Sequence, residues 1–259
     1  MSARTRFSAN ISMLFGEYEP LDRIAAAARA GFEAVEFLFP YDFPVAEIRA
    51  RLQDNDIVIN HLNTRPGDRF GLAAQPGRED EFAKVFDQAL DYATQLGALT
   101  IHCMSGVVAP EDRPRAKETF LRNMERAGRK TAGTGVTLVI EPINTYDRAN
   151  FFVSRSDEIV EFLKELNQPA VKLLFDFYHI QIMEGDLTRR LDRHWDHIGH
   201  FQFASVPSRN EPDLGEVNLK PLFADIVKRG WQGFLGAEYR PAARTEDGLG
   251  WLTTLAVTA

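Results

Sequence analysis

Eight short apolar segments alternate with amphipathic stretches along the 259 residues, and this alternation limits the choice of fold more than any other feature. Strands that alternate with helices form parallel sheets that the helices cover. The expected strands are Arg6–Met13, Ala34–Pro40, Ile57–Asn63, Leu99–Ser105, Thr137–Asn144, Val171–Tyr178, His200–Ser205 and Gly233–Tyr239. The expected helices are Pro20–Ala30, Val45–Asp54, Glu79–Leu96, Arg113–Ala132, Arg155–Leu166, Leu187–Trp195, Leu219–Arg229 and Thr245–Leu255.

The number of these units favours a closed barrel. Each unit occupies about 32 residues, which is the repeat length of a (β/α)₈ TIM barrel of about 250 residues. No Gly-x-Gly-x-x-Gly motif follows the first expected strand, and this argues against a dinucleotide-binding open sheet. No change of composition marks a domain boundary, so the sequence predicts one TIM-barrel domain over residues 1–259.

Composition narrows the class of protein further. The net charge of −7 argues against a nucleic-acid partner. Cys103 is the only cysteine, so neither an intrachain disulfide nor a cysteine-based zinc cluster can form, and its apolar neighbours predict a buried thiol. No stretch of 18 apolar residues and no signal-peptide pattern is present, and we therefore expect a cytoplasmic protein without a membrane partner.

Four consecutive expected strands each end in an oxygen-bearing side chain among apolar neighbours. These side chains are Glu141, Asp176, Gln202 and Glu238. In a barrel of this kind the carboxyl ends of the strands carry the active site. Burying three carboxylates together is costly without compensation, and a divalent cation would offset that cost. Carboxylate and amide oxygens favour Mg²⁺ or Mn²⁺ over Zn²⁺, so the sequence predicts a cation site of that kind.

Several motifs give the chain a resemblance to a known family. The residues that carry it are Arg6-Phe-Ser-Ala-Asn-Ile-Ser-Met-Leu-Phe, Gly31-Phe-Glu-Ala-Val-Glu-Phe-Leu-Phe-Pro-Tyr, Ile140-Glu-Pro-Ile-Asn, Asp176-Phe-Tyr-His and Gly236-Ala-Glu-Tyr. Over nearly its whole length the chain resembles the hydroxypyruvate isomerase family, within the xylose-isomerase-like barrels that include the ketose 3-epimerases.

The resemblance implies roles for particular side chains. The positions that match the family's metal ligands are Glu141, Asp176, Gln202 and Glu238. Two of these, Glu141 and Glu238, also match the residues that donate and accept the proton. His179 and Arg209 match substrate-binding residues, and Asp147 matches an acidic position that faces the substrate in the epimerases. The third ligand is a histidine in the epimerases and a glutamine here, which shifts the site toward oxygen ligands.

The activity that the resemblance implies is the interconversion of hydroxypyruvate and 2-hydroxy-3-oxopropanoate (tartronate semialdehyde). A bound cation would polarise the carbonyl group and stabilise an enediolate. One glutamate would then remove a proton from the carbon that bears the hydroxyl group, and the other would return it to the neighbouring carbon. A hydride shift between the two carbons remains the alternative, because a carboxylate bound to a cation is a weak base.

Two further residues are candidates for binding the substrate. The connection Thr64–Arg78 is long for a compact domain and follows the third expected strand, so it should overhang the catalytic face. It carries Arg65, a candidate partner for a substrate carboxylate. His61 ends the third strand and is expected to face the site.

Other buried polar residues are expected to be structural. We expect Glu36 to point into the barrel beneath the site, and His102 to pack in the core. The histidines at positions 194, 197 and 200 are expected on the face opposite the site.

Four alternative functions remain open at this point. The first two are a ketose 3-epimerase and a 2-oxo-tetronate isomerase on the same barrel. An endonuclease IV-like nuclease would need several histidines at a multi-zinc site, and a non-catalytic binding protein would not need two opposed glutamates. The expected partner is a small hydroxy-oxo acid, and the formation of a homo-oligomer is left open.

Overall fold

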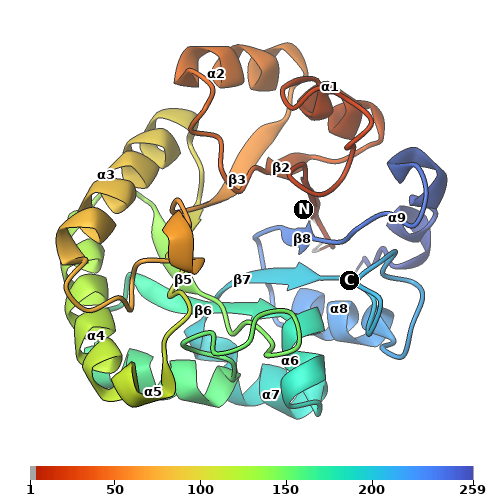
Figure 1. Cartoon of the computed structure of the whole chain (residues 1–259). Coiled ribbons are helices and arrows are strands. Elements are labelled where there is room, and N and C mark those ends of the chain that lie inside the picture. The colour runs from red at the N-terminus through yellow and green to blue at the C-terminus, as the bar shows by residue number, and fades with distance from the viewer. Residues whose placement is uncertain (1–3, 259) are drawn as a thin grey trace.

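A closed barrel of eight parallel strands forms the centre of the computed structural model, which describes residues 4–258 (Figure 1). Each strand pairs with its neighbours in chain order, and β1 closes the barrel by pairing with β8. The strands are β1 Phe7–Asn10, β2 Ala34–Glu36, β3 Val58–Asn63, β4 Thr100–His102, β5 Thr137–Ile140, β6 Val171–Asp176, β7 Ile198–Phe203 and β8 Leu235–Ala237. The predicted single TIM-barrel fold is therefore confirmed.

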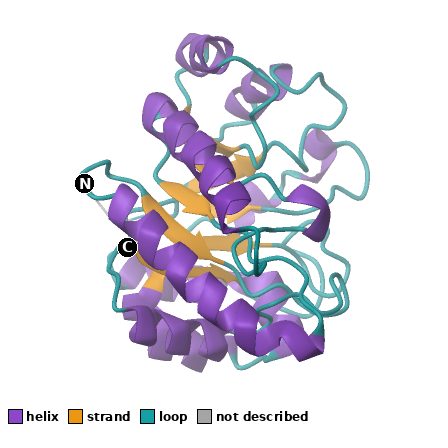
Figure 2. Cartoon of the chain, turned by 60° about the vertical axis from the view of Figure 1, so that its left-hand side comes forward, coloured by secondary structure: helices purple, strands orange, loops and turns teal. Residues whose placement is uncertain are grey.

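Helices surround this barrel on the outside (Figure 2). The α-helices are α1 Asp22–Arg29, α2 Val45–Asp54, α3 Glu79–Leu96, α4 Arg113–Lys130, α5 Ser156–Leu166, α6 Phe177–Met183, α7 Leu187–His194, α8 Leu219–Lys228 and α9 Trp251–Thr254. Short 3₁₀ turns cover Gly67–Arg69, Pro110–Asp112, Trp195–His197 and Thr245–Gly248. Within residues 4–258, no helix combines the length and the apolarity needed to cross a membrane.

One helix was not expected from the sequence. The apolar run of β6 was predicted to continue to Tyr178, but the strand ends at Asp176 and α6 begins at the next residue. The cause is local, because the carboxylate of Asp176 accepts a hydrogen bond from the backbone N–H of Tyr178 at 2.8 Å and so caps the helix. This cap turns the chain immediately after the barrel and places His179 in the first turn of α6.

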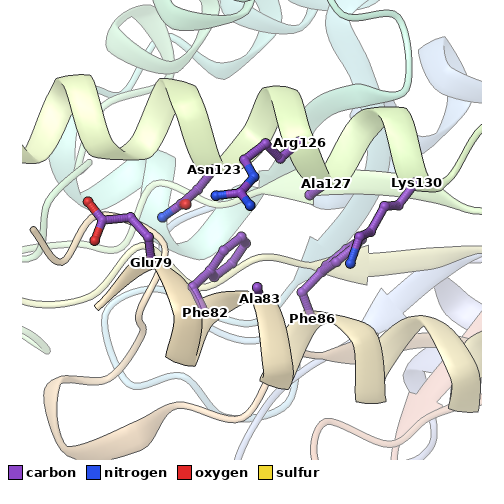
Figure 3. A pocket seen from close by; sticks show the side chains of 8 residues that line it. All are labelled: Glu79, Phe82, Ala83, Phe86, Asn123, Arg126, Ala127 and Lys130. Carbon is purple, nitrogen blue, oxygen red and sulfur yellow. The ribbon is translucent and has the colours of Figure 1, made fainter. Parts of the chain in front are cut away.

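Apolar and aromatic side chains fill the space between the strands and the helices. Phe203 on β7 and Phe7 on β1 both contact Phe223 of α8, with ring centroids 5.0 and 5.8 Å apart. The same kind of packing joins neighbouring helices, as Phe82 and Phe86 of α3 point toward α4 (Figure 3). The many phenylalanines of the sequence therefore build an outer apolar layer.

The interior of the barrel is unusually polar. Side chains alternate along each strand, so the residues between the outward-facing aromatics point to the barrel axis. Bulky aliphatic residues commonly fill this space in such barrels. Here the buried polar residues on the strands and at their ends are Ser8, Asn10, Glu36, His61, Asn63, Thr100, His102, Glu141, Asp176, His200, Gln202 and Glu238. The upper part of this polar interior is the floor of the candidate site.

Candidate active site

A cavity opens at the carboxyl ends of the strands, where the predicted site residues were expected. Glu141, His179, Arg209, Glu238 and Asp147 line it together. The connection after β3 contributes Pro66 and Phe70 to its wall, so the expectation that this connection overhangs the catalytic face is confirmed. Asp176 and Gln202 are buried and do not line the cavity wall.

Glu141 follows β5 and faces one group from strand β4 and one from helix α6. Its Oε2 lies 3.4 Å from Nδ1 of His102, and its Oε1 lies 3.6 Å from Nε2 of His179. Nε2 of His179 is also 3.7 Å from Oδ2 of Asp176. These distances are longer than typical hydrogen bonds, so Nε2 of His179 is not firmly bonded to either carboxylate.

Glu238 follows β8 and is more tightly held than Glu141. Its Oε1 accepts a hydrogen bond from the amide of Asn10 at 3.0 Å, and its Oε2 accepts one from the Arg209 guanidinium at 2.5 Å. Arg209 also lies 3.6 Å from Asp147 and packs over the ring of Tyr178 at 4.8 Å. The Arg209 side chain is therefore bonded to Glu238, while its buried Nε has no hydrogen-bond partner among residues 4–258.

The hydrogen bonds of His179 determine which of its nitrogens carries the proton. Oδ1 of Asn144 accepts from the backbone N–H groups of Tyr146 and Asp147, so its amide nitrogen must face His179. This amide and the Asn144 backbone N–H both donate to Nδ1 of His179, at 2.8 and 3.2 Å. Nδ1 is then the unprotonated nitrogen, and Nε2 carries the hydrogen. A protonated Nε2 has no lone pair for a metal, so His179 is suited to donate a hydrogen bond.

Three buried oxygens at the site have no hydrogen-bond partner in the described part of the chain. They are Oε1 of Glu141, Oδ2 of Asp176 and Oε1 of Gln202. Glu141 and Asp176 offer ligand oxygens that lie within 4.8 Å of each other. Unpaired buried oxygens are costly, and a hard divalent cation would satisfy all three. Glu141 and Asp176 could therefore hold a metal ion, whereas the roles of Gln202 and Glu238 as further ligands stay a prediction.

Burial sets the proton affinity of the three carboxyl groups. Burial raises the pKa of Glu238 to about 7, although the positive charge of Arg209 opposes this rise. Burial raises the pKa of Asp176, and it raises the pKa of Glu141 well above its ordinary value with the help of Glu238 and Asp176. Without a cation, this cluster therefore retains protons near neutral pH.

The structure does not bring Arg65 or His61 to the cavity. Arg65 points away, toward Asp42 at 2.8 Å and Gln88 at 3.2 Å, and its guanidinium lies over the ring of Tyr41. His61 lies inside the barrel, where it bonds Thr100 and Asn63 and stacks on His200 with ring centroids 4.8 Å apart. These contacts occupy both side chains, so the expectation that they face the site is not met.

One structural expectation needs refinement and another needs correction. His102 is buried, as expected of a core residue, but it also lies at the wall of the cavity beside Glu141. His200 was expected on the opposite face, but β7 begins at Ile198, which places His200 inside the barrel with its Nε2 2.7 Å from Glu36. Only His194 and His197 precede β7, where the expected opposite face lies.

Two arginines of the cavity were not recognised in the sequence. Arg148 lies over the ring of Phe70, with its guanidinium carbon 3.5 Å from the ring centroid. Arg240, two residues beyond Glu238, also lines the cavity. Within residues 4–258, neither arginine side chain has an ion pair or a hydrogen bond to a protein group. The wall of this cavity thus carries two arginine side chains without a charge partner among residues 4–258, in addition to the buried carboxylates.

The barrel and its site define the class of protein. The family model described as "Xylose isomerase-like TIM barrel" matches residues 24–255. The chain belongs to this family.

Curated relatives and a solved structure match almost the whole chain. The 2-oxo-tetronate isomerase of Cupriavidus necator is 47% identical over 95% of this chain and 97% of its own. The hydroxypyruvate isomerase of Escherichia coli is 38% identical over 95% of this chain and 98% of its own. The crystal structure of AP endonuclease, family 2 from Brucella melitensis superposes with a TM-score of 0.94 at 42% identity, over 96% of this chain and 98% of that chain.

Proposed function

We propose that this protein is an isomerase of small hydroxy-oxo acids that interconverts hydroxypyruvate and 2-hydroxy-3-oxopropanoate. The observation that carries the proposal is a pair of buried glutamates, Glu141 and Glu238, which line one cavity near the unpartnered oxygens of Asp176 and Gln202. The isomerase names of the Cupriavidus necator and Escherichia coli relatives support the same class of reaction.

In this proposal the four oxygen-bearing side chains hold Mg²⁺ or Mn²⁺. Glu141, Asp176, Gln202 and Glu238 supply hard oxygen donors, and the three orphaned oxygens are the observation that supports the assignment. When bound, the cation would supply Lewis-acid polarisation of the substrate carbonyl.

The two glutamates move the proton between carbons. One removes a proton from the carbon that bears the hydroxyl group, and the other delivers a proton to the former carbonyl carbon. The hydroxyl proton passes to the former carbonyl oxygen, so the reaction is a net isomerisation. His179 donates a hydrogen bond from Nε2 to a substrate oxygen, because its Nδ1 is held as an acceptor by Asn144.

The carboxylate of the substrate needs a cation of its own. Arg209 matches the substrate-binding arginine of the family, but its charge is already shared between Glu238 and Asp147. We assign Arg209 to holding Glu238 and orienting it toward the substrate. Arg148 and Arg240 line the cavity without a partner among residues 4–258, and we assign Arg148 to the substrate carboxylate because its stacking on Phe70 fixes its position.

A substrate panel tests this function. Protein stripped of metal and then restored with Mn²⁺ or Mg²⁺ would be assayed with hydroxypyruvate, a four-carbon 2-oxo acid, neutral ketoses and DNA with an abasic site. We expect turnover of the hydroxy-oxo acids, with little on neutral ketoses and no cleavage of DNA. Activity on DNA alone would overturn the proposal and agree with the name of the Brucella melitensis structure. Full activity after chelation would refute the role of the cation.

A four-carbon 2-oxo acid is the second candidate substrate. The specific observation in its favour is the 47% identity to the 2-oxo-tetronate isomerase of Cupriavidus necator, against 38% to the hydroxypyruvate isomerase. The longer acid differs from hydroxypyruvate by one CH₂OH group, and Ser12, Asn63 and Arg240 offer polar contacts on the cavity wall. The ratio of kcat/KM for the two acids in the panel decides between them.

A further inference from the structure

Glu36 is a fully buried carboxylate for which the proposed reaction has no role. It ends β2, and its carboxylate accepts hydrogen bonds from four other side chains. Ser8 donates to Oε1 at 3.0 Å, and Nε2 of His200 lies 2.7 Å from the same oxygen. Gln202 donates to Oε2 at 2.7 Å, and Asn10 donates to it at 3.5 Å. All four contacts come from side chains that can donate a hydrogen, so Glu36 is the acceptor at the centre of this group.

The hydrogen bond to Glu36 fixes the direction of the Gln202 amide. A carboxylate only accepts hydrogen bonds, so the NH₂ group of Gln202 must face Glu36 and the amide oxygen must face the other way. That oxygen is one of the three buried oxygens without a partner. The register of β6 and β7 pairs Gln202 with Asp176, whose Oδ2 is another of them. The amide is therefore held with its oxygen available to a cation.

The surrounding barrel makes room for this contact. Gly236 on β8 faces Glu36, and a Cβ atom at that position would lie 2.1 Å from Oε1 of Glu36. Asn10 links the same carboxylate to Glu238, because its amide contacts both groups. The Glu36 carboxylate thus contacts Gln202 directly and Glu238 through Asn10, and both are proposed cation ligands.

We propose that Glu36 is a positioning residue that holds the Gln202 amide in the one orientation in which its oxygen can bind the cation. This inference rests on the cation site of the proposed function. Outer hydrogen bonds of this type typically change metal affinity by about 10- to 100-fold. A carboxylate at position 202 would not need this control, because it presents an oxygen in either orientation.

The test compares binding of Mn²⁺ to the substrate-free protein, measured by the EPR signal of free Mn²⁺ and by calorimetry. Glu36→Met keeps the length of the side chain but removes the acceptor, and we expect it to weaken binding about 10- to 100-fold. Glu36→Gln keeps an acceptor oxygen, so binding should stay within about fivefold of the wild type. The double variant E36M/Q202E should recover most of the lost affinity, although it carries the same apolar substitution.

Ser8→Ala is the matched control, since it removes one hydrogen bond to Glu36 that does not reach Gln202. Circular dichroism and thermal unfolding establish that each variant is folded. If folded E36M binds Mn²⁺ like the wild type, or if E36M/Q202E is no better than E36M, the positioning role is wrong. If the wild type binds no Mn²⁺, the cation of the proposed function fails, and this inference fails with it.

Discussion

At the scale of single residues, the two cavity glutamates differ in how firmly they are held. Glu238 uses both oxygens in hydrogen bonds to Asn10 and Arg209, whereas Oε1 of Glu141 has no partner among residues 4–258. In the proposed reaction, we therefore expect substrate or cation binding to change Glu141 more than Glu238, which is already oriented by its hydrogen bonds.

Substitution of either glutamate by glutamine tests the proton transfer. Glu141→Gln and Glu238→Gln should each lower kcat by about 10²- to 10⁴-fold, because an amide cannot accept and return the proton. Assays of the wild type in D₂O should place deuterium on the carbon of the product that receives the proton. Full activity of both variants would refute the mechanism, and a product without deuterium would favour the hydride shift.

Arg148 provides a separate test of substrate recognition. Arg148→Ala should raise KM for hydroxypyruvate roughly 10- to 100-fold, because it removes a charge-assisted hydrogen bond to the carboxylate. Dihydroxyacetone, in which CH₂OH replaces the carboxylate, is the neutral comparison and should be affected little. Each compound would be measured as a substrate or, if it is not turned over, as a competitive inhibitor. If Arg148→Ala weakens the binding of both compounds equally, Arg148 acts on the shape of the cavity and does not recognise the carboxylate.

Sequence reasoning located the strand-end residues but not their partners. Glu141, Asp176, Gln202 and Glu238 could be found because the carboxyl end of a barrel strand is a position that the sequence marks. Arg148 could not, because its contact with Phe70 joins two loops that only the fold brings together. The contact of Glu36 on β2 with His200 on β7 could not be predicted for the same reason, because these strands are far apart in the sequence.

At the scale of elements, helices were easier to predict than strands. Both ends of α2 and α3 fall where the apolar periodicity placed them. Most strands were predicted too long, because the chain remains apolar beyond the last ladder hydrogen bond as it enters the loops. Strand β7 was instead predicted to begin and end two residues too late. The helix α6 was missed because its start depends on one cap, Asp176, inside an apolar run.

The connection after β3 depends on one glycine. Gly71 has a φ of +142°, and a Cβ atom there would lie 2.4 Å from the carbonyl oxygen of Met104. Gly71→Ala should therefore displace the neighbouring Phe70, lower kcat/KM by about tenfold, and cost about 1–3 kcal/mol of stability. Steady-state kinetics and thermal unfolding measure the two effects.

Gly77 supplies the control in the same connection. It also has a positive φ, +82°, but nothing lies within 4 Å of the position of its Cβ atom. Gly77→Ala should cost about 1 kcal/mol of stability through backbone strain and leave kcat/KM unchanged. If both variants have the same kinetics, the position of Phe70 does not matter for the reaction.

At the scale of the whole molecule, the polar interior contains titratable groups that oppose one another. Burial lowers the pKa values of His61 and His102 to about 3, so the unfolded chain takes up protons that the folded chain refuses as pH falls below about 6.5. This lowers stability in acid. Burial raises the pKa values of Glu141, Asp176 and Glu238, which has the opposite effect over the same range. Burial also lowers the pKa of His179 well below its ordinary value, which adds to the loss of stability in acid. In the cation-free protein we therefore expect the two effects to cancel only in part.

A variant separates the two contributions. His61→Gln should destabilise the protein at pH 7.5, since it disturbs the contacts with Thr100 and Asn63. The difference in unfolding free energy from the wild type should then shrink by up to about 1.4 kcal/mol per pH unit between pH 6.5 and 4.5, because the variant has no imidazole to protonate. Urea unfolding at several pH values measures this difference, and a constant difference would contradict the sign.

The separation of a polar barrel interior from an aromatic outer layer has a consequence for how this protein can evolve. Residues that hold the fold together, such as Phe203 and Phe223, lie between strands and helices, whereas the residues to which we assign the chemistry lie along the axis and at the rim. Substitutions at well-separated sites tend to add independently. Gains in robustness in the outer layer can therefore accumulate without altering the reaction, and the rim can acquire a new substrate while the outer layer stays the same.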